Sequence, residues 1–299
     1  MKALVIGATG RVAGHLTQRL CEEGIRVRGL VRDPHKAAAR FADAPRVLAN
    51  LEIITGIFDD PSVLQSAYKG VDIAFLALGT SQQQIALEKR LIIAAAHARL
   101  PQLIRLSVLD SDLNADYEVA RRHGELDAYL AGSEVPHTLL RPAYFASNLL
   151  FAAASIASDS RWYGSAPNGR IAMIDPRDVA DAALAVICNP ALQNSEYRLT
   201  GVEALSFPEV ADRFTAVLGR RINYIAVDAA ALRKGYVARA VPDWLADIAV
   251  GIDSAMQAGR HANVTAQLQQ LTGNAPRTLD DFIRDHIAAF TAVPVRREA

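Results

Sequence analysis

The chain has 299 residues, 51% of them hydrophobic and 21% charged, which suits one large α/β domain with an appended lobe or two modest domains. Its 32 basic and 32 acidic side chains cancel, so the charge argues against nucleic acid or an anionic membrane as a partner. The two cysteines, Cys21 and Cys188, lie far apart and outside any Cys-x-x-Cys, which disfavours a disulfide framework and favours a cytoplasmic location.

The first half of the chain alternates short apolar runs with segments of helical periodicity. The first helical segment places Val12, Ala13, Leu16 and Leu20 on one face and stops at Gly24. Strict alternation of strand and helix predicts a parallel sheet with helices on both faces, that is, a doubly wound α/β fold. The predicted strands are residues 3–6, 26–31, 51–55, 72–78, 103–107 and 137–141.

After about residue 148 the pattern becomes mostly helical. Two strand-like pieces, 170–174 and 196–200, are embedded in it. Three helices carry start signals: Asp175-Pro176, Ser206 with Glu209, and Thr278 with Asp281. We therefore expect a dinucleotide-binding domain over residues 1–148, to which the two strand-like pieces could add, and a smaller, mainly helical substrate lobe over residues 149–299 at the carboxyl edge of the sheet.

The stretch GATGRVAG, residues 7–14, lies where the first strand turns into the first helix. Gly7 supplies the freedom that a tight turn needs, and Gly10 lets a pyrophosphate approach the backbone. The helix amino terminus then offers unpaired N–H groups and a partial positive charge. Ala13 is the small residue where helix and strand cross. The motif therefore reads G-x-x-G-x-x-A and predicts a nucleotide site; the alternative is a turn that binds nothing.

The second strand ends in LVRDP, which places Arg32 where an acidic residue would hold the ribose hydroxyls of NAD. A guanidinium there can bind a 2′-phosphate, so the sequence favours NADP, and Arg11 could supply a second contact. The alternative is that Arg32 is only solvated and Asp33 holds the ribose of NAD.

With these residues in place, the chain resembles the NmrA-like branch of the atypical short-chain dehydrogenase/reductases. The resemblance covers nearly the whole chain. The matching stretches are GATGRVA, VRDP, GIFDDPSVLQSAYKGVDIAFLAL, HGELDAYLAGSEVPHTLLRPAYFASNLL, IDPRDVADAAL and YRLTGVEALSFPEVADRF.

The resemblance implies a Rossmann-type domain that binds NADPH through the glycine turn, with the 2′-phosphate near Arg32. It also implies a loop along the cofactor after the fourth strand, Ser107 near the nicotinamide, and a wall for the ring at residues 141–145. The implied cofactor contacts are Gly7, Thr9, Gly10, Arg11, Val12, Arg32, Leu78, Gly79, Thr80, Ser107, Pro142 and Phe145. From the residues alone, a Ser at that strand end could equally satisfy loop backbone.

Two features depart from the family pattern. An acidic residue near the adenine is replaced by Ile57, and Asp59 is a weak substitute. The Tyr-x-x-x-Lys pair, in which an ammonium lowers the pKa of a proton-donating phenol, is absent. Alignment with relatives puts His123 at the lysine position and Val119 at the tyrosine position.

Other residues could donate the proton. His123 could donate to a ribose hydroxyl or act as general acid, although a lone histidine is often structural. Tyr117 and Arg121 read Tyr-x-x-x-Arg, but their register turns them off the expected face, so we interpret them as a solvated helix start. Catalytic candidates are His123, Ser107 and Tyr144. Candidates for lining a substrate site are Tyr144, Phe145, Trp162, Tyr163, Tyr236 and Trp244.

The sequence as a whole predicts an NADPH-dependent reductase acting on an apolar, aromatic or quinone-like carbonyl or conjugated acceptor. The alternative is a non-catalytic NADP-binding redox sensor of the NmrA type, which would have a protein partner; cofactor-assisted isomerisation is a third possibility. The seven histidines lack His-Glu-x-x-His spacing, so no metal is expected. We expect a small-molecule substrate, no nucleic acid and no membrane, and a homodimer is compatible with the sequence.

Overall fold

The predicted parallel sheet is present, and it gains one strand from the second half of the chain. The computed structural model describes residues 1–292. All six strand pairs are parallel, and the order reverses between β1 and β4, as in a doubly wound fold. In spatial order the strands are β3 (Leu51–Thr55), β2 (Arg26–Val31), β1 (Lys2–Ile6), β4 (Ile73–Leu76), β5 (Leu103–Leu106), β6 (His137–Pro142) and β9 (Glu196–Leu199).

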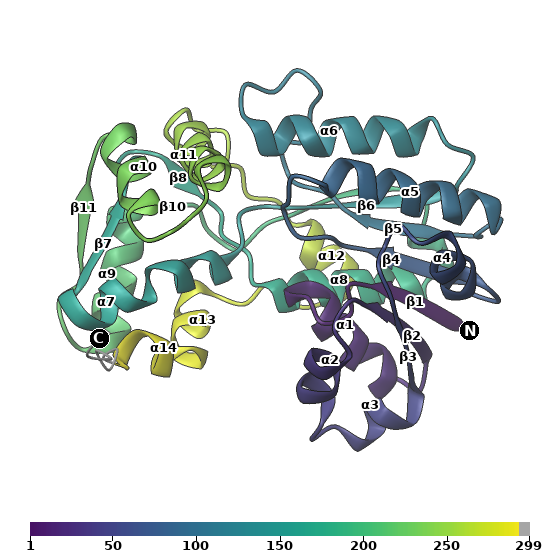
Figure 1. The fold of residues 1–299 in the computed structure, drawn as a ribbon. Coiled ribbons are helices and arrows are strands. Elements are labelled where there is room, and N and C mark those ends of the chain that lie inside the picture. Colours follow the sequence, from purple (N-terminus) through teal and green to yellow (C-terminus); the bar gives the residue numbers. More distant parts are fainter. Residues whose placement is uncertain (293–299) are drawn as a thin grey trace.

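Helices cover both faces of this sheet (Figure 1) and enclose two hydrophobic cores. The predicted apolar face of the first helix, Val12, Ala13, Leu16 and Leu20, is buried in one of them. On that face lie α1 (Arg11–Glu22), α2 (Pro34–Phe41), α3 (Pro45–Asn50), α8 (Pro176–Cys188), which η2 (Pro190–Leu192) follows, and α12 (Gln267–Thr272); on the other lie α4 (Pro61–Tyr68), α5 (Gln84–His97) and α6 (Glu118–Ala131).

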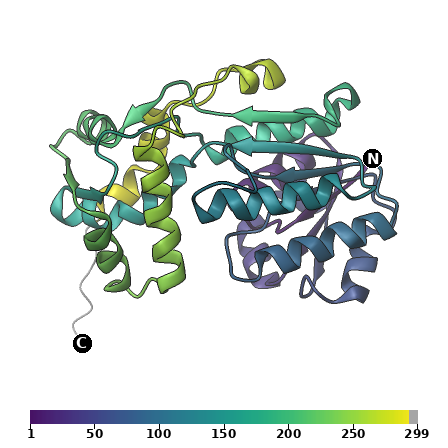
Figure 2. The same cartoon turned by 90° about the horizontal axis from the view of Figure 1, so that it is seen from above.

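The remaining elements form a smaller lobe beside the sheet, with its own apolar core (Figure 2). The prediction of a strand over 170–174 is wrong beyond its first two residues. Arg170 and Ile171 pair only with β10, and Ile174 instead makes an isolated bridge to Phe145. The lobe contains η1 (Ala146–Ala152), α7 (Ala153–Asp159), β7 (Arg161–Gly164), β8 (Arg170–Ile171), β10 (Leu205–Ser206), α9 (Phe207–Leu218), β11 (Asn223–Ala226), α10 (Ala229–Val237), α11 (Asp243–Gln257), α13 (Leu279–Asp285) and α14 (Ile287–Thr291).

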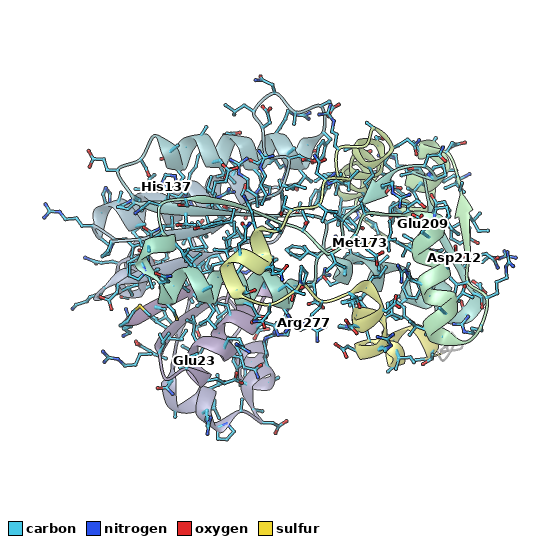
Figure 3. All side chains as sticks on the ribbon, turned by 180° about the vertical axis from the view of Figure 1, so that it is seen from behind. Glu23, His137, Met173, Glu209, Asp212 and Arg277 are labelled. Atoms are coloured by element: carbon cyan, nitrogen blue, oxygen red, sulfur yellow. The ribbon has the colours of Figure 1, made fainter. Side chains whose placement is uncertain are left out.

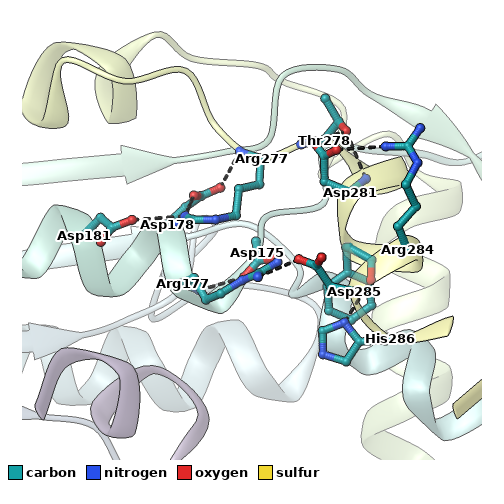
Figure 4. Close-up of polar contacts among 11 residues, drawn as sticks. Asp175, Arg177, Asp178, Asp181, Arg277, Thr278, Asp281, Arg284, Asp285 and His286 are labelled. Carbon is teal, nitrogen blue, oxygen red and sulfur yellow. Dashed lines mark hydrogen bonds and ion pairs between the residues drawn. The ribbon is translucent and has the colours of Figure 1, made fainter. Parts of the chain in front are cut away.

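The amino terminus of α8 ties the two parts together (Figure 4). Asp175 caps α8 by accepting from the backbone N–H of Arg177, as predicted. The Arg177 guanidinium bridges Asp175 at 2.6 Å and Asp285 of α13 at 2.7 Å. Arg277 lies on the segment that crosses from α12 to α13, at the junction of the two parts (Figure 3), and its backbone N–H donates to Asp178 at 2.8 Å. The stretch 175–178 is thus structural, because it fixes the lobe against the sheet.

The other two predicted helix starts are also confirmed. Ser206 and Glu209 form a reciprocal capping box at α9, and Thr278 and Asp281 form another at α13. Each box satisfies two backbone N–H groups that a helix would otherwise leave unpaired.

Candidate functional site

The glycine turn has the geometry that its sequence predicts. Gly7 has φ +72°, and a Cβ there would lie 2.9 Å from the carbonyl oxygen of Ala77. Gly10 precedes α1 with no side chain that could cap it, so the first-turn N–H groups are available to a ligand oxygen. Ala13 is buried where the helix crosses the strand. Thr9 and Val12 flank this turn, with Thr9 half-buried and Val12 buried.

Arg32 follows β2 at the same edge of the sheet. Its side chain is exposed, lies 5.7 Å from the centre of the Phe58 ring, and forms no ion pair within residues 1–292. Asp33 accepts from the backbone N–H groups of His35 and Lys36, so it serves as the cap of α2. Both of these bonds use Oδ1, so Arg32 and the Oδ2 oxygen of Asp33 are each available to a ligand at this strand end, and the choice between NADP and NAD stays a prediction.

Ile57 and Asp59, the two positions considered for the adenine contact, both lie at the surface. Ile57 is 62% exposed. Asp59 accepts from Arg90 at 2.9 Å on the surface, so the carboxylate already has a cationic partner.

Arg11 points across to the lobe. Its guanidinium donates to Ser147 Oγ and Asn148 Oδ1, both at 3.0 Å, and lies over the Phe151 ring. These contacts join the start of α1 to η1. A contact between Arg11 and the 2′-phosphate stays a prediction, and it would require these hydrogen bonds to break.

The other predicted cofactor contacts lie at carboxyl ends of neighbouring strands. Leu78, Gly79 and Thr80 follow β4, and the last two are exposed. Pro142 ends β6, and Phe145 lies three residues further on. Because β4 and β6 run parallel to β1 in the same sheet, the structure brings all of these positions to the edge that carries the glycine turn.

Ser107 lies just after β5, but its hydroxyl is already committed. It donates to Asp127 Oδ2 at 2.8 Å, and Ser111 donates to the same oxygen at 2.5 Å. A serine hydroxyl has one proton to donate. In this arrangement Ser107 can accept a hydrogen bond from a ligand, but it cannot donate one.

Beneath Ser107 lies a buried charge network that the sequence analysis missed. Arg105, with no exposed surface, donates from Nε to Glu88 at 2.9 Å and also pairs with Asp127. Burial raises the pKa of Glu88, and the charge of Arg105 opposes that rise. The sequence did contain a signal for this network. Arg105 interrupts the apolar strand run LIRLS, and a buried guanidinium requires carboxylate partners.

His123 belongs to the same network. Its Nδ1 lies 3.3 Å from a guanidinium nitrogen of Arg105, and its Nε2 lies 3.4 Å from the Gln84 amide nitrogen. Burial, followed by the charge of Arg105, lowers the pKa of His123 well below its usual value. A role as general acid stays a prediction that this neutral, buried imidazole does not favour.

Tyr117 is not the solvated residue that the sequence suggested. It is 7% exposed and packs against Ala255 of α11, while Arg121 is exposed. Its hydroxyl donates to Asp110 at 3.4 Å, and its ring meets that of His261 edge-on. The reason for the error is a contact more than 130 residues away along the chain, which helical periodicity does not reveal.

Tyr144 lies beyond the end of β6, facing the lobe. Burial raises its pKa, and Tyr236 and Asp253 add to the rise, whereas Asn148 and Arg11 oppose it. Its ring packs against the hydrophobic core of the lobe.

The remaining aromatic candidates differ in their surroundings. Trp162 is 8% exposed and packs on Phe207 and Tyr224, so it belongs to the lobe core. Tyr163 and Trp244 are half-buried.

A doubly wound sheet with a glycine turn before its first helix defines a Rossmann-type dinucleotide-binding protein. The NmrA-like family model matches residues 1–282, and the chain belongs to this family. Both the predicted fold class and the predicted family are confirmed.

Three relatives illustrate the range of the family. The chain is 31% identical to a (4-alkanoyl-5-oxo-2,5-dihydrofuran-3-yl)methyl phosphate reductase of Streptomyces griseus, over 96% of this chain and 98% of that one. Its fold matches the crystal structure of an Escherichia coli NADPH-dependent quinone oxidoreductase in complex with NADPH. The TM-score is 0.86, the sequences are 25% identical, and the match covers 96% of this chain and 99% of that one. NmrA, a negative transcriptional regulator crystallised with NAD, has the same fold at 18% identity, with TM-score 0.76 over 95% and 94%.

The length and apolar character of the helices bear on whether the chain could cross a membrane. Within residues 1–292, none of the helices combines the length and the apolar character that crossing a bilayer demands.

Proposed function

We propose that this protein is an NADPH-dependent oxidoreductase that transfers hydride to an apolar, aromatic or quinone-like carbonyl or conjugated acceptor. The bound dinucleotide would supply the hydride. The amides after Gly10 would hold its diphosphate, Arg32 its 2′-phosphate, and the loop 78–80 with Pro142 and Phe145 would run along the nicotinamide half. The relatives that are reductases support the reaction class.

One observation carries the proposal: the start of α1, which follows the glycine turn, is in contact with η1 of the lobe. Arg11 of α1 donates to Ser147 and Asn148 of η1, and Tyr144, two residues before η1, packs against the core of the lobe. An acceptor between Tyr144 and the nicotinamide would touch both parts of the chain. We accordingly keep residues 1–148 as the proposed cofactor domain, although β9 and α8 extend its layers, and residues 149–299 as the proposed substrate lobe.

Cofactor choice gives the first test. In R32D the guanidinium that would bind the 2′-phosphate is replaced by a carboxylate, and one charge-assisted hydrogen bond is worth ~1.5–3 kcal/mol, or roughly 10- to 150-fold in affinity. We expect calorimetry to show NADPH binding weakened by that factor and NADH binding unchanged or improved. R161D is the matched control, since Arg161 is exposed on β7 and also has no acidic partner within residues 1–292. An unchanged preference in R32D would refute the assignment of NADP.

Turnover gives the second test. NADPH oxidation is followed over a panel of quinones and aromatic ketones. Turnover with at least one of them supports the proposal, and tight NADPH binding with no turnover of any acceptor contradicts it.

A regulatory role is the second candidate, favoured by one observation in the structure: Ser107 and His123, at two positions of the expected catalytic apparatus, are both held inside a buried network. A sensor should bind NADP and NADPH with different affinities and should retain a protein partner. Equal affinities together with turnover would exclude this candidate.

A further inference from the structure

Arg11, the first residue of α1, holds the lobe with only part of its guanidinium. Its Nη1 donates to Ser147 Oγ and to Asn148 Oδ1, both at 3.0 Å, and the guanidinium carbon lies 5.3 Å from the centre of the Phe151 ring. An Nη nitrogen carries two hydrogens, so these bonds use both of them. The three remaining N–H groups, on Nε and Nη2, find no acceptor within residues 1–292. Arg11 can therefore keep its bonds to the lobe and still bind a second partner.

The charge of Arg11 lies at the end of α1 that disfavours a cation. The amino terminus of a helix carries a partial positive charge, and the first turn of α1 contains no acidic residue. Arg19, in the last turn, has the opposite arrangement, because it lies at the negative end of the helix and its Nε is 3.7 Å from the Asp181 carboxylate. No acidic side chain within residues 1–292 pairs with Arg11. An anion at this turn would therefore be stabilised by the guanidinium and by the first-turn N–H groups together.

A bridge whose role is structural alone has a different charge balance in this molecule. At the start of α8, the Arg177 guanidinium lies between the carboxylates of Asp175 and Asp285, at 2.6 Å and 2.7 Å, so its charge is compensated on both sides. Arg11 instead donates to the neutral oxygens of a serine and an amide. Its charge stays uncompensated within the described residues, and it can still gain an ion pair with an anionic ligand.

The diphosphate of the proposed cofactor is the anion that fits this position. The glycine turn ends at Gly10, directly before Arg11, and the amides after Gly10 would hold the diphosphate. A guanidinium can bind phosphate oxygens through a pair of parallel N–H groups, and Nε and Nη2 form such a pair. In this arrangement Arg11 keeps both bonds to η1, which a contact with the 2′-phosphate would require it to break.

The helix η1 connects Arg11 to the residues proposed as the wall of the nicotinamide site. It packs into the apolar core of the lobe through Ala146 and Leu149. The segment just before it holds Phe145, which is the N-cap of η1, and Tyr144. Because these residues are continuous with η1 in the chain, the position of η1 sets where their side chains lie.

We propose that Arg11 is a positioning residue that couples the cofactor to this wall: it binds the diphosphate through Nε and Nη2 and holds η1 through Nη1. With the diphosphate bound, the guanidinium is fixed, and η1 and the wall before it are fixed in turn. This inference rests on the proposed NADPH-dependent function, because it concerns the substrate side of the same site.

The test uses two fragments of the cofactor and needs no turnover. 2′-Phospho-ADP-ribose carries the diphosphate without the nicotinamide, and 2′-AMP carries the same adenosine and 2′-phosphate without the diphosphate. Each is titrated calorimetrically into the protein, and amide hydrogen exchange of residues 146–152 is followed with each ligand at saturation. R11M removes the charge and every donor, and S147A/N148A keeps the guanidinium but removes its acceptors on η1. R19M is the matched control on the same helix.

In the wild type we expect 2′-phospho-ADP-ribose to slow exchange across residues 146–152 by about fivefold or more, as for typical coupling between two sites, and 2′-AMP to leave it unchanged. In R11M, binding of 2′-phospho-ADP-ribose should weaken about tenfold or more, as for loss of a charged contact, whereas binding of 2′-AMP should change by less than about twofold. The slowing should disappear in R11M and in S147A/N148A, although the latter should still bind 2′-phospho-ADP-ribose. R19M should match wild type throughout.

The outcomes separate the two proposals. Equal slowing by both fragments, slowing that persists in R11M or in S147A/N148A, or unchanged affinity of R11M for 2′-phospho-ADP-ribose would each overturn this inference. Turnover of NADPH with a quinone alongside any of these results would leave the proposed function intact. If R11M does not fold, S147A/N148A still decides, because it leaves α1 unchanged and breaks only the link to η1. A wild-type protein that binds neither 2′-phospho-ADP-ribose nor NADPH would count against both.

Discussion

Replacement of Arg105 by methionine tests the buried charge network most directly. Arg105 has no exposed surface, and its guanidinium pairs with Glu88 and Asp127, which are 1% and 7% exposed. In R105M the Asp127 carboxylate keeps two serine donors and Arg141 Nη2 at 3.3 Å. Among residues 1–292, Glu88 keeps only the Gln84 amide, at 3.0 Å, and becomes a nearly unpaired buried charge.

Removal of one member of a buried ion pair typically costs ~3–5 kcal/mol, which is roughly a fifth or more of the ~5–15 kcal/mol that holds a typical domain together. We expect urea unfolding, followed by circular dichroism, to show a loss of that size for R105M at pH 7. R90M is the matched control, because Arg90 and its partner Asp59 are both exposed, and such pairs contribute ~0–1 kcal/mol.

The pH dependence sharpens this test. Without Arg105, the folded-state pKa of Glu88 should rise further above the unfolded value, so the carboxylate destabilises the protein wherever it is ionised in the unfolded chain. That penalty shrinks as the pH falls toward the unfolded pKa of a glutamate, ~4.3. The difference between R105M and wild type should therefore narrow between pH 7 and pH 5. A loss no larger than that of R90M, or a difference that widens at low pH, would refute the reasoning.

Two further predictions concern stability. Burial lowers the pKa of His123 and His261 in the folded state, so the unfolded chain binds more protons as the pH falls through ~6.5, and stability should drop by up to ~1.4 kcal/mol per pH unit for each histidine. Urea unfolding at several pH values should show a shallower slope in H123Q and H261Q. A Cβ at Gly124 would lie 2.3 Å from loop backbone, so thermal melts of G124A should show a loss of ~1–3 kcal/mol. At Gly14 the clash is with the flexible Arg40 side chain, and the helix gains ~1 kcal/mol in propensity from alanine, so the melting temperature of G14A should stay near or above wild type.

Local signals account for the parts of the fold that could be predicted from the sequence. Alternating apolar runs predict the sheet, and Ser206 and Thr278 predict helix starts, because such patterns report interactions among residues a few positions apart. The strand expected at 170–174 ends early, because Ile174 turns away to bridge Phe145 of another segment. No local pattern carries that information.

The candidate site likewise has parts with a local sequence signature and parts without one. The glycine turn and Arg32 could be found because a nucleotide site at a strand end has a sequence signature. The buried charge network could not, because Arg105, Glu88 and Asp127 lie on three different elements, and only the packing of those elements brings the charges together.

The hydrogen bonds at the carboxyl ends of the strands determine which side chains could still donate a proton to a substrate. At the carboxyl end of β5, Ser107 gives its proton to Asp127, and His123 is neutral and buried. The sheet therefore positions a cofactor but offers a substrate little acid or charge. Tyr144, which follows β6, packs against the hydrophobic core of the lobe. It follows that substitutions in the lobe should change which acceptor is reduced, whereas substitutions in the Arg105 network should change stability before they change selectivity.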